Sequence, residues 1–136
     1  MANTTTISSP GKVLAAGGYL VLDPAYSGVV ISTSSRFYSV VQDRGGTNRI
    51  RVRSPQFIDA VWNYSVELKD QSIKVEQIAS STGTNTPKNK FVHLALLHTL
   101  SFAFSERNVS VEALDKGLDI VIAGDNDFYS QRAKHP

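Results

Sequence analysis

Apolar and polar residues alternate over residues 49–53 and 61–68, which is the pattern of strands that bury one face. Within the last of these segments, for example, Trp62, Tyr64 and Val66 fall on the same side. The run Val29-Val30-Ile31 is continuous instead, which predicts a buried strand. Antiparallel hairpins are the simplest arrangement of such a meander. Strands are therefore predicted at residues 7–15, 19–22, 28–32, 37–42, 49–53 and 61–68.

The second half of the chain changes to a helical pattern. A stretch rich in Ser, Thr, Gly, Asn and Pro predicts a loop, after which Asn89 can cap a helix over residues 90–105. A short helix over residues 111–116, ended by Gly117, and a strand over residues 118–123 follow. Strands followed by a helix and a further strand predict an α+β fold, with a mixed, mostly antiparallel sheet and one long helix against it.

The predicted long helix is apolar on more than one face. Such a helix is expected to be covered on both sides, so we predict near-complete burial. Within residues 1–136 only the strand meander is available to cover one side. We therefore expect uncovered apolar surface, marginal stability and self-association. The apolar positions of the helix are Phe91, Val92, Leu94, Ala95, Leu96, Leu97, Leu100, Phe102 and Phe104.

Composition narrows the class of protein. Hydrophobic residues make up 41% of the 136 residues and charged residues 19%, which is typical of one globular domain. A net charge of +2 is too small to favour nucleic acid as a partner, and Arg49, Arg51 and Arg53 are interpreted as one solvated strand face. The chain has no cysteine, no apolar run of membrane-spanning length and no signal-peptide pattern at its start. A cytoplasmic protein without a membrane partner is expected.

One stretch of the chain carries the strongest indication of chemistry. Residues 8–23 read Ser-Ser-Pro-Gly-Lys-Val-Leu-Ala-Ala-Gly-Gly-Tyr-Leu-Val-Leu-Asp, which places Lys12, a lysine that looks buried, in an apolar strand before the pair Gly17-Gly18. A lysine supplies positive charge, and glycines let the backbone approach a phosphate closely. The alternatives are a lysine that extends from a strand edge and glycines that only form a bulge.

This stretch resembles the first motif of the GHMP kinases, a superfamily of small-molecule kinases. Gly17 is followed by Gly18-Tyr19 and not by Glu-His, and in this the stretch is most similar to the phosphomevalonate kinases. Residues 31–38 resemble the next strand pair of that family. Residues 117–120 and 124–130 resemble the segment that leads toward its ATP loop, so the resemblance spans nearly the whole chain.

The resemblance implies a fold, an activity and a set of residue roles. The fold is the N-terminal α+β part of a GHMP kinase domain, of the type called ribosomal protein S5 domain 2-like. The activity is transfer of the ATP γ-phosphate to 5-phosphomevalonate in isoprenoid synthesis, with ATP and Mg²⁺ as the complete enzyme's cofactors. Lys12 would be catalytic, near the transferred phosphate. Gly17, Gly18 and Tyr19 would bind the substrate, although Tyr19 also fits a half-buried strand position. Asn89 would lie at the nucleotide, but Lys90 replaces the family's proline there, so helix capping is the alternative.

The chain also departs from the family pattern. The family's Gly-Leu-Gly-Ser-Ser-Ala loop for the nucleotide is absent from residues 1–136, so the resemblance implies an incomplete N-terminal domain that stops before that loop. We expect this chain alone to be inactive. A different GHMP kinase and a non-catalytic binding or interaction module are the alternatives, and a peroxisomal location is the alternative for the longer family members.

The acidic loop near the end of the chain has the residue types of a metal or phosphate site. Loops of this composition bind magnesium in some proteins, but the same residues are favoured for turn chemistry. The family's carboxylates for magnesium lie in later segments, so no metal ligand is predicted here. The residues of this loop are Asp125, Asn126, Asp127 and Ser130.

Overall fold

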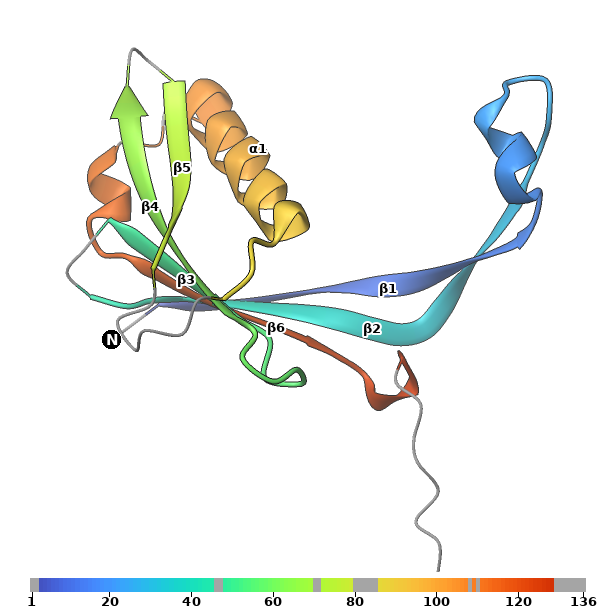
Figure 1. The fold of residues 1–136 in the computed structure, drawn as a ribbon, viewed down its shortest axis with the longest axis horizontal. Helices are drawn as coiled ribbons and strands as arrows, with labels where there is room; N and C mark the ends of the chain where they lie inside the picture. The colour runs from blue at the N-terminus through green and yellow to red at the C-terminus, as the bar shows by residue number, and fades with distance from the viewer. Residues whose placement is uncertain are drawn as a thin grey trace, which may run out of the picture. The chain divides into compact units, whose positions relative to one another are not determined.

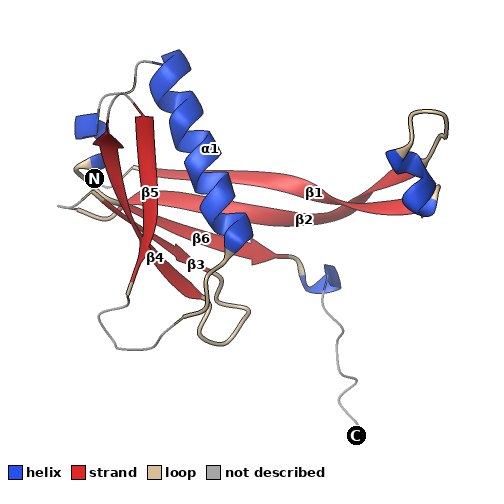
Figure 2. Ribbon diagram, turned by 45° about the horizontal axis from the view of Figure 1, so that its top comes forward, coloured by secondary structure: helices blue, strands red, loops and turns tan. Residues whose placement is uncertain are grey.

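The computed structural model describes residues 3–45, 48–69, 72–79, 86–107, 109 and 111–128. Six strands form one sheet in the order β1-β2-β6-β3-β4-β5, and an 18-residue helix accompanies them (Figures 1 and 2). Strand β3 pairs antiparallel with β4 and parallel with β6, and β4 pairs antiparallel with β5. The α+β class with a mixed sheet is confirmed. The elements are β1 (Thr4–Ala16), η1 (Gly18–Leu22), β2 (Val29–Asp43), β3 (Arg49–Arg53), β4 (Val61–Lys69), β5 (Ser72–Ile78), α1 (Lys90–Arg107), η2 (Val111–Leu114), β6 (Leu118–Gly124) and η3 (Asn126–Phe128).

The chain divides into two compact units. The first, called the sheet unit, comprises Met1–Thr6 and Ser39–Ile122 and contains β3, β4, β5 and α1. The second, called the ribbon unit, comprises Ile7–Tyr38 and Ala123–Pro136 and contains most of β1 and β2. Strands β1, β2 and β6 each contribute residues to both units.

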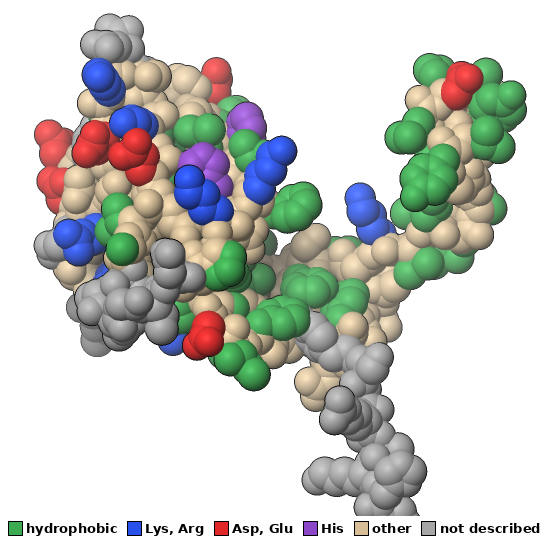
Figure 3. Space-filling view, in the orientation of Figure 1, with side chains coloured by type: hydrophobic (Ala, Val, Ile, Leu, Met, Phe, Trp, Pro, Cys, Tyr) green, Lys and Arg blue, Asp and Glu red, His purple; other side chains and the backbone are tan. Residues whose placement is uncertain are grey.

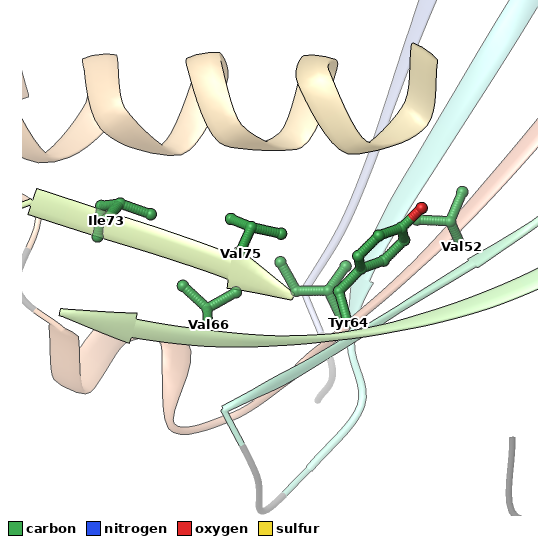
Figure 4. Packing of buried hydrophobic residues seen from close by; sticks show 6 residues of the cluster. Val52, Tyr64, Val66, Ile73 and Val75 are labelled. Atoms are coloured by element: carbon green, nitrogen blue, oxygen red, sulfur yellow. The ribbon is translucent and has the colours of Figure 1, made fainter. Parts of the chain in front are cut away.

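The hydrophobic core lies in the sheet unit, between α1 and the strands (Figure 4). Alternate residues of β3, β4 and β5 point to this core, as the period of two in a strand requires. Tyr64 is fully buried, and its hydroxyl has no hydrogen-bond partner among the described residues. Burial raises the pKa of this phenol because the charged form loses its water. The buried cluster consists of Ile50, Val52, Tyr64, Val66, Ile73 and Val75.

Helix α1 begins where the sequence predicts. The Asn89 side-chain oxygen Oδ1 accepts hydrogen bonds from the backbone N–H groups of Phe91 and Val92, both at 3.1 Å, so capping by Asn89 is confirmed. One side of the helix contributes partly buried residues to the core. These residues are Val92, Leu96, Leu97, Leu100 and Phe104.

The prediction that α1 is nearly all buried is wrong. Phe91 is 85% exposed and Phe102 is 60% exposed, because the helix packs on the sheet with one face only. Among the residues that the structure describes, no element covers the opposite face. The broad apolar pattern therefore leaves large side chains in contact with solvent.

Two strands of the sheet unit differ from the sequence prediction. Strand β5 was not predicted, although Ile73 and Val75 alternate with polar residues and are buried. Strand β6 forms close to the predicted place, but it pairs parallel to β3, so the meander of antiparallel hairpins does not include this pairing. The segment predicted as a short helix over residues 111–116 is the 3-10 turn η2.

The ribbon unit is built from the paired strands β1 and β2, with η1 between them (Figure 1). The prediction of a strand over residues 19–22 is wrong, because these residues belong to η1. Hydrogen bonds from Leu20 N to Gly17 O (3.1 Å) and from Asp23 N to Leu20 O (3.0 Å) close this 3-10 helix. The two strands predicted at residues 28–32 and 37–42 are parts of the one long strand β2.

The prediction of a buried strand at residues 28–32 is also wrong. The side chains of Val29, Val30 and Ile31 are each more than half exposed. A continuous apolar run predicts burial only where layers lie on both faces of the strand. No such layers exist over this part of β2 within the described part of the ribbon unit.

Candidate functional site

Lys12 lies in β1, at the edge of the sheet, in the ribbon unit. Its side chain is exposed, so the interpretation of Lys12 as a buried lysine is wrong. The neighbouring Val13 and Leu14 are exposed too, which explains why an apolar neighbourhood in sequence does not bury this residue. No described residue forms an ion pair with Lys12, so its ammonium group can reach an anion in solution.

The Gly17-Gly18 pair starts the turn into η1. Gly17 has a φ of 116° and Gly18 a φ of 46°, both in the left-handed region that favours glycine. A Cβ atom on Gly17 would also collide with the side chain of Val21 and lie 2.9 Å from the Cα of Gly28. Gly17 is therefore required for two reasons, whereas the space around Gly18 is open. The glycines shape a chain reversal in the ribbon unit.

Tyr19 follows this turn and is 92% exposed, so a half-buried strand position for Tyr19 is wrong. In Figure 3 hydrophobic side chains gather at the tip formed by η1 and its flanking turns. Leu20, Leu22 and Tyr26 are the exposed large side chains beside Tyr19 in this part of the chain. The phenol of Tyr19 is thus available to a ligand.

The carboxylates of the acidic loop after β6 accept hydrogen bonds from β2. The Arg36 backbone N–H donates to Oδ2 of Asp125 at 2.7 Å, and the Ser35 hydroxyl donates to Oδ2 of Asp127 at 3.1 Å. These long-range hydrogen bonds to β2 occupy one oxygen of each carboxylate. No three His, Cys, Asp or Glu residues among those described are arranged to hold a metal ion, and Ser130 lies outside the described residues.

The structure brings together the three stretches of sequence that carry the family resemblance. Arg36 in β2 donates from Nε to the Ser8 hydroxyl oxygen at 2.8 Å and from Nη2 to the Ser8 carbonyl at 3.0 Å. Phe128 packs on Phe37 with ring centroids 4.4 Å apart. A Cβ atom on Gly11 would lie 2.5 Å from the Phe128 ring, so this contact requires the glycine. Residues 8–11, 35–37 and 125–128 thus form one packed region of the ribbon unit.

Sequence reasoning missed the role of Arg36. A charged residue in the middle of a strand is the available signal, because a guanidinium there needs an acceptor on a neighbouring strand. Arg36 supplies that link between β1 and β2 and also carries the backbone N–H that binds Asp125. Arg36 thus joins β2 to β1, the strand that carries Lys12.

Asn89 belongs to the sheet unit, whereas the other predicted site residues belong to the ribbon unit. It lines a hollow of about 640 Å³ between the start of α1 and β5, together with Lys88, Lys90 and His93. The acceptor oxygen of Asn89 is already bound to two backbone N–H groups of the helix. The side chain therefore acts as a helix cap, and its amide nitrogen has no partner within the described part of the chain.

A charged cluster that the sequence did not predict lies on the sheet face opposite the core. Asp119 in β6 is only 3% exposed and accepts hydrogen bonds from both Arg51 and Arg53, with shortest distances of 2.8 Å to each. The Gln42 amide adds a bond of 3.3 Å. The interpretation of the arginines as a merely solvated face is wrong, because β6 places a carboxylate beside them. The hydrogen bond from Arg51 is the main reason that the pKa of Asp119 lies far below its usual range.

No helix in the described part of the chain is long and apolar enough to cross a membrane.

Comparison with known proteins supports the resemblance. The chain is 33% identical over 95% of its length to the phosphomevalonate kinase of Aspergillus fumigatus, and 34% identical over 93% of its length to that of Gibberella zeae. A peroxisomal phosphomevalonate kinase of Arabidopsis thaliana is 33% identical over 92% of the chain. The chain spans 32%, 30% and 26% of the length of these three relatives. No family model and no solved structure matches the chain. By sequence, the chain is similar over nearly its whole length to about a third of these phosphomevalonate kinases.

Proposed function

We propose that this chain is a segment of a phosphomevalonate kinase, whose complete form phosphorylates 5-phosphomevalonate with ATP to give mevalonate diphosphate in isoprenoid and sterol synthesis. The observation that carries the proposal is the identity of about a third over more than nine-tenths of the chain, repeated in fungal and plant relatives. We further propose that the fold is the N-terminal α+β part of a GHMP kinase domain, which stops before the glycine-rich ATP loop.

In this proposal the ribbon unit supplies groups for the acceptor substrate and the transferred phosphate. Lys12 is the catalytic cation, and it suits that role because its ammonium group is exposed and no described residue pairs with it. Gly17 and Gly18 hold a tight turn that presents Tyr19 to the substrate. Asn89 would contribute to the nucleotide through its amide nitrogen only. A bound ATP–Mg²⁺ complex would supply the phosphoryl group, and its triphosphate would need a glycine-rich loop that residues 1–136 lack.

The first expected result concerns activity. The purified 136-residue chain should form no mevalonate diphosphate from ATP, Mg²⁺ and 5-phosphomevalonate, because phosphoryl transfer needs the nucleotide positioned as well as its charge neutralised. A phosphomevalonate kinase extended to a length like that of the relatives is the positive control. A coupled assay measures the ADP formed, and mass spectrometry detects mevalonate diphosphate. Turnover by the short chain above that of a boiled sample would contradict the expectation.

The second candidate function is a non-catalytic binding or interaction module. The observation that favours it is the amount of large apolar side chain in solvent, including Phe91, Phe102 and Leu22. Monomeric soluble proteins rarely leave extended apolar patches uncovered, and association through the exposed side chains would remove them from water. Self-association of the chain is the partner that this candidate implies.

The isolated chain is accordingly expected to bind the dye ANS and to elute as an oligomer in size-exclusion chromatography. Burial of apolar surface contributes about 25 cal/mol per Å², so a few hundred Å² are enough to drive association. Combining Phe91→Ser with Leu22→Ser should lower ANS fluorescence and shift elution toward the monomer. Lys116→Ser, at another exposed position, serves as the control. A monomer that unfolds cooperatively and does not bind ANS would rule out association through these side chains.

We also propose a cytoplasmic location for the complete protein, with the peroxisome as the alternative because one relative is named peroxisomal. Fluorescence microscopy of a fusion to the complete protein distinguishes the two, since only a peroxisomal protein overlaps a peroxisomal marker.

A further inference from the structure

The polar face of the sheet unit holds two arginines in an arrangement that the proposed kinase function does not use. Arg51 and Arg53 are two residues apart in β3 and point away from the core, because Ile50 and Val52 alternate with them and are buried. Asp119 lies opposite Arg51 in the parallel register of β3 and β6. All three side chains therefore meet on the face that α1 does not cover.

The shared carboxylate fixes both guanidinium groups. Arg51 donates to Asp119 from Nε at 2.8 Å and from Nη2 at 3.0 Å, and Arg53 donates from Nε at 3.3 Å and from Nη2 at 2.8 Å. With the bond from Gln42, the carboxylate accepts five N–H groups, which fills its acceptor capacity. Asp119 is thus fully used, and the arginines are ordered before any ligand arrives.

Donors remain on the arginines after Asp119 is satisfied. A guanidinium has five N–H groups, and each arginine directs two of them to the carboxylate. No described residue accepts a hydrogen bond from Nη1 of either arginine. Their side chains are 33% and 37% exposed, so the remaining donors are open to solvent.

The charge of this face is not balanced by Asp119 alone. Arg49 lies on the same face of β3, is exposed and has no described ion pair, so three guanidinium groups accompany one carboxylate. Lys74 and Glu76 of β5 form an ion pair with each other at 2.8 Å, so their charges cancel. Arg51, Arg53 and Asp119 together carry one net positive charge, which favours an anionic ligand at this place.

We propose that Arg51 and Arg53 form a binding site for a phosphate group, preorganised by Asp119. A tetrahedral phosphate presents oxygens in several directions, so it can accept hydrogen bonds from the remaining donors of both guanidinium groups while Asp119 stays bound. Ordering of the arginines in the free protein removes part of the entropy cost of binding. The phosphate comes from free inorganic phosphate or from a phosphate monoester.

The test is a titration of the 136-residue chain with inorganic phosphate and, separately, with glycerol phosphate, at constant ionic strength. Binding is followed by calorimetry and by the NMR signals of the arginine Nε–H groups. Saturable binding of either ligand, with shifts confined to the Arg51 and Arg53 signals, supports the site, and the tighter ligand identifies the source. No saturation, or shifts of arginines throughout the chain, would overturn the proposal.

Variants separate a site from general charge screening. Arg53→Gln should weaken phosphate binding about tenfold or more, since it removes charged hydrogen-bond donors. Arg107→Gln, the same change in the exposed last turn of α1, should leave binding within about twofold. Equal weakening by both variants would overturn the proposal. If Arg53→Gln unfolds the chain, Arg53→Lys is used instead, because it keeps the positive charge and removes the two-pronged guanidinium group. Unchanged phosphate affinity in Arg53→Lys would also overturn the proposal.

Discussion

Replacing Lys12 by alanine in a complete phosphomevalonate kinase that carries this segment is expected to lower kcat about a hundredfold or more, with little change in KM for ATP. A cation placed at the transferred phosphate acts mainly in the transition state, where charge on the phosphate oxygens is redistributed. Loss of one such preorganised electrostatic contact typically costs about 10²-fold in kcat. The exposed ammonium group of Lys12, on a strand edge without an ion-pair partner among the described residues, fits this use better than a structural one.

Steady-state kinetics with both substrates varied provide the measurement, and a folding check by circular dichroism accompanies it. Lys116→Ala removes another exposed lysine and should leave kcat unchanged. Equal kcat for wild type and Lys12→Ala would show that Lys12 has no part in catalysis. A rise in KM for ATP without loss of kcat would make Lys12 a ground-state binding residue.

Replacing Asp119 by asparagine is expected to destabilise the sheet unit by about 1.5–3 kcal/mol. The substitution removes the charged acceptor that binds Arg51 and Arg53, and a hydrogen bond to a charged group typically contributes about 1.5–3 kcal/mol, while the partly exposed arginines can still be hydrated. Unfolding in urea, followed by circular dichroism, measures the loss. Asp115→Asn, an exposed aspartate in the turn after η2, should change the free energy of unfolding by less than about 0.5 kcal/mol.

The effect of Asp119 should also depend on pH. Its pKa in the folded protein is depressed, chiefly by the hydrogen bond from Arg51, so the unfolded chain takes up the proton at a higher pH than the folded chain. The stabilisation is complete above the unfolded carboxyl pKa of about 4, and it is lost as pH falls through that value toward the lower folded pKa. The difference in stability between wild type and Asp119→Asn should therefore be constant from pH 5 to pH 7 and narrow below pH 4. A difference that stays constant down to pH 3 would contradict this.

Local features of the fold were predictable because their causes are local. The Asn89 cap needs only a side chain two or three residues from the backbone groups that it binds. Alternation in β3 and β4 correctly assigned Tyr64 and Val66 to one face. The exposure of Val29 to Ile31 was not predictable, because an apolar run states a preference for burial and contains no information about whether a covering layer exists.

The candidate site shows the same division. The Gly17-Gly18 pair predicted a close turn, and the left-handed φ angles agree. The exposure of Lys12 depends on the edge position of β1, which is set by strand order and not by the neighbours of the residue. The partner of Arg51 could not be found from sequence spacing, because Asp119 lies 68 positions away.

That long separation has a consequence for how the chain folds. Strand β3 meets β4 soon after synthesis, but its other neighbour, β6, becomes available only when residue 118 has been made. Closing so long a loop is entropically costly, so insertion of β6 is expected to be a late step of folding. Until then β3 is an open edge that could pair with strands of other nascent chains. The arginines of β3 keep that edge charged during the delay, as lysines do on exposed edges of finished sheets. Two of them are then bound by Asp119 when the correct strand arrives.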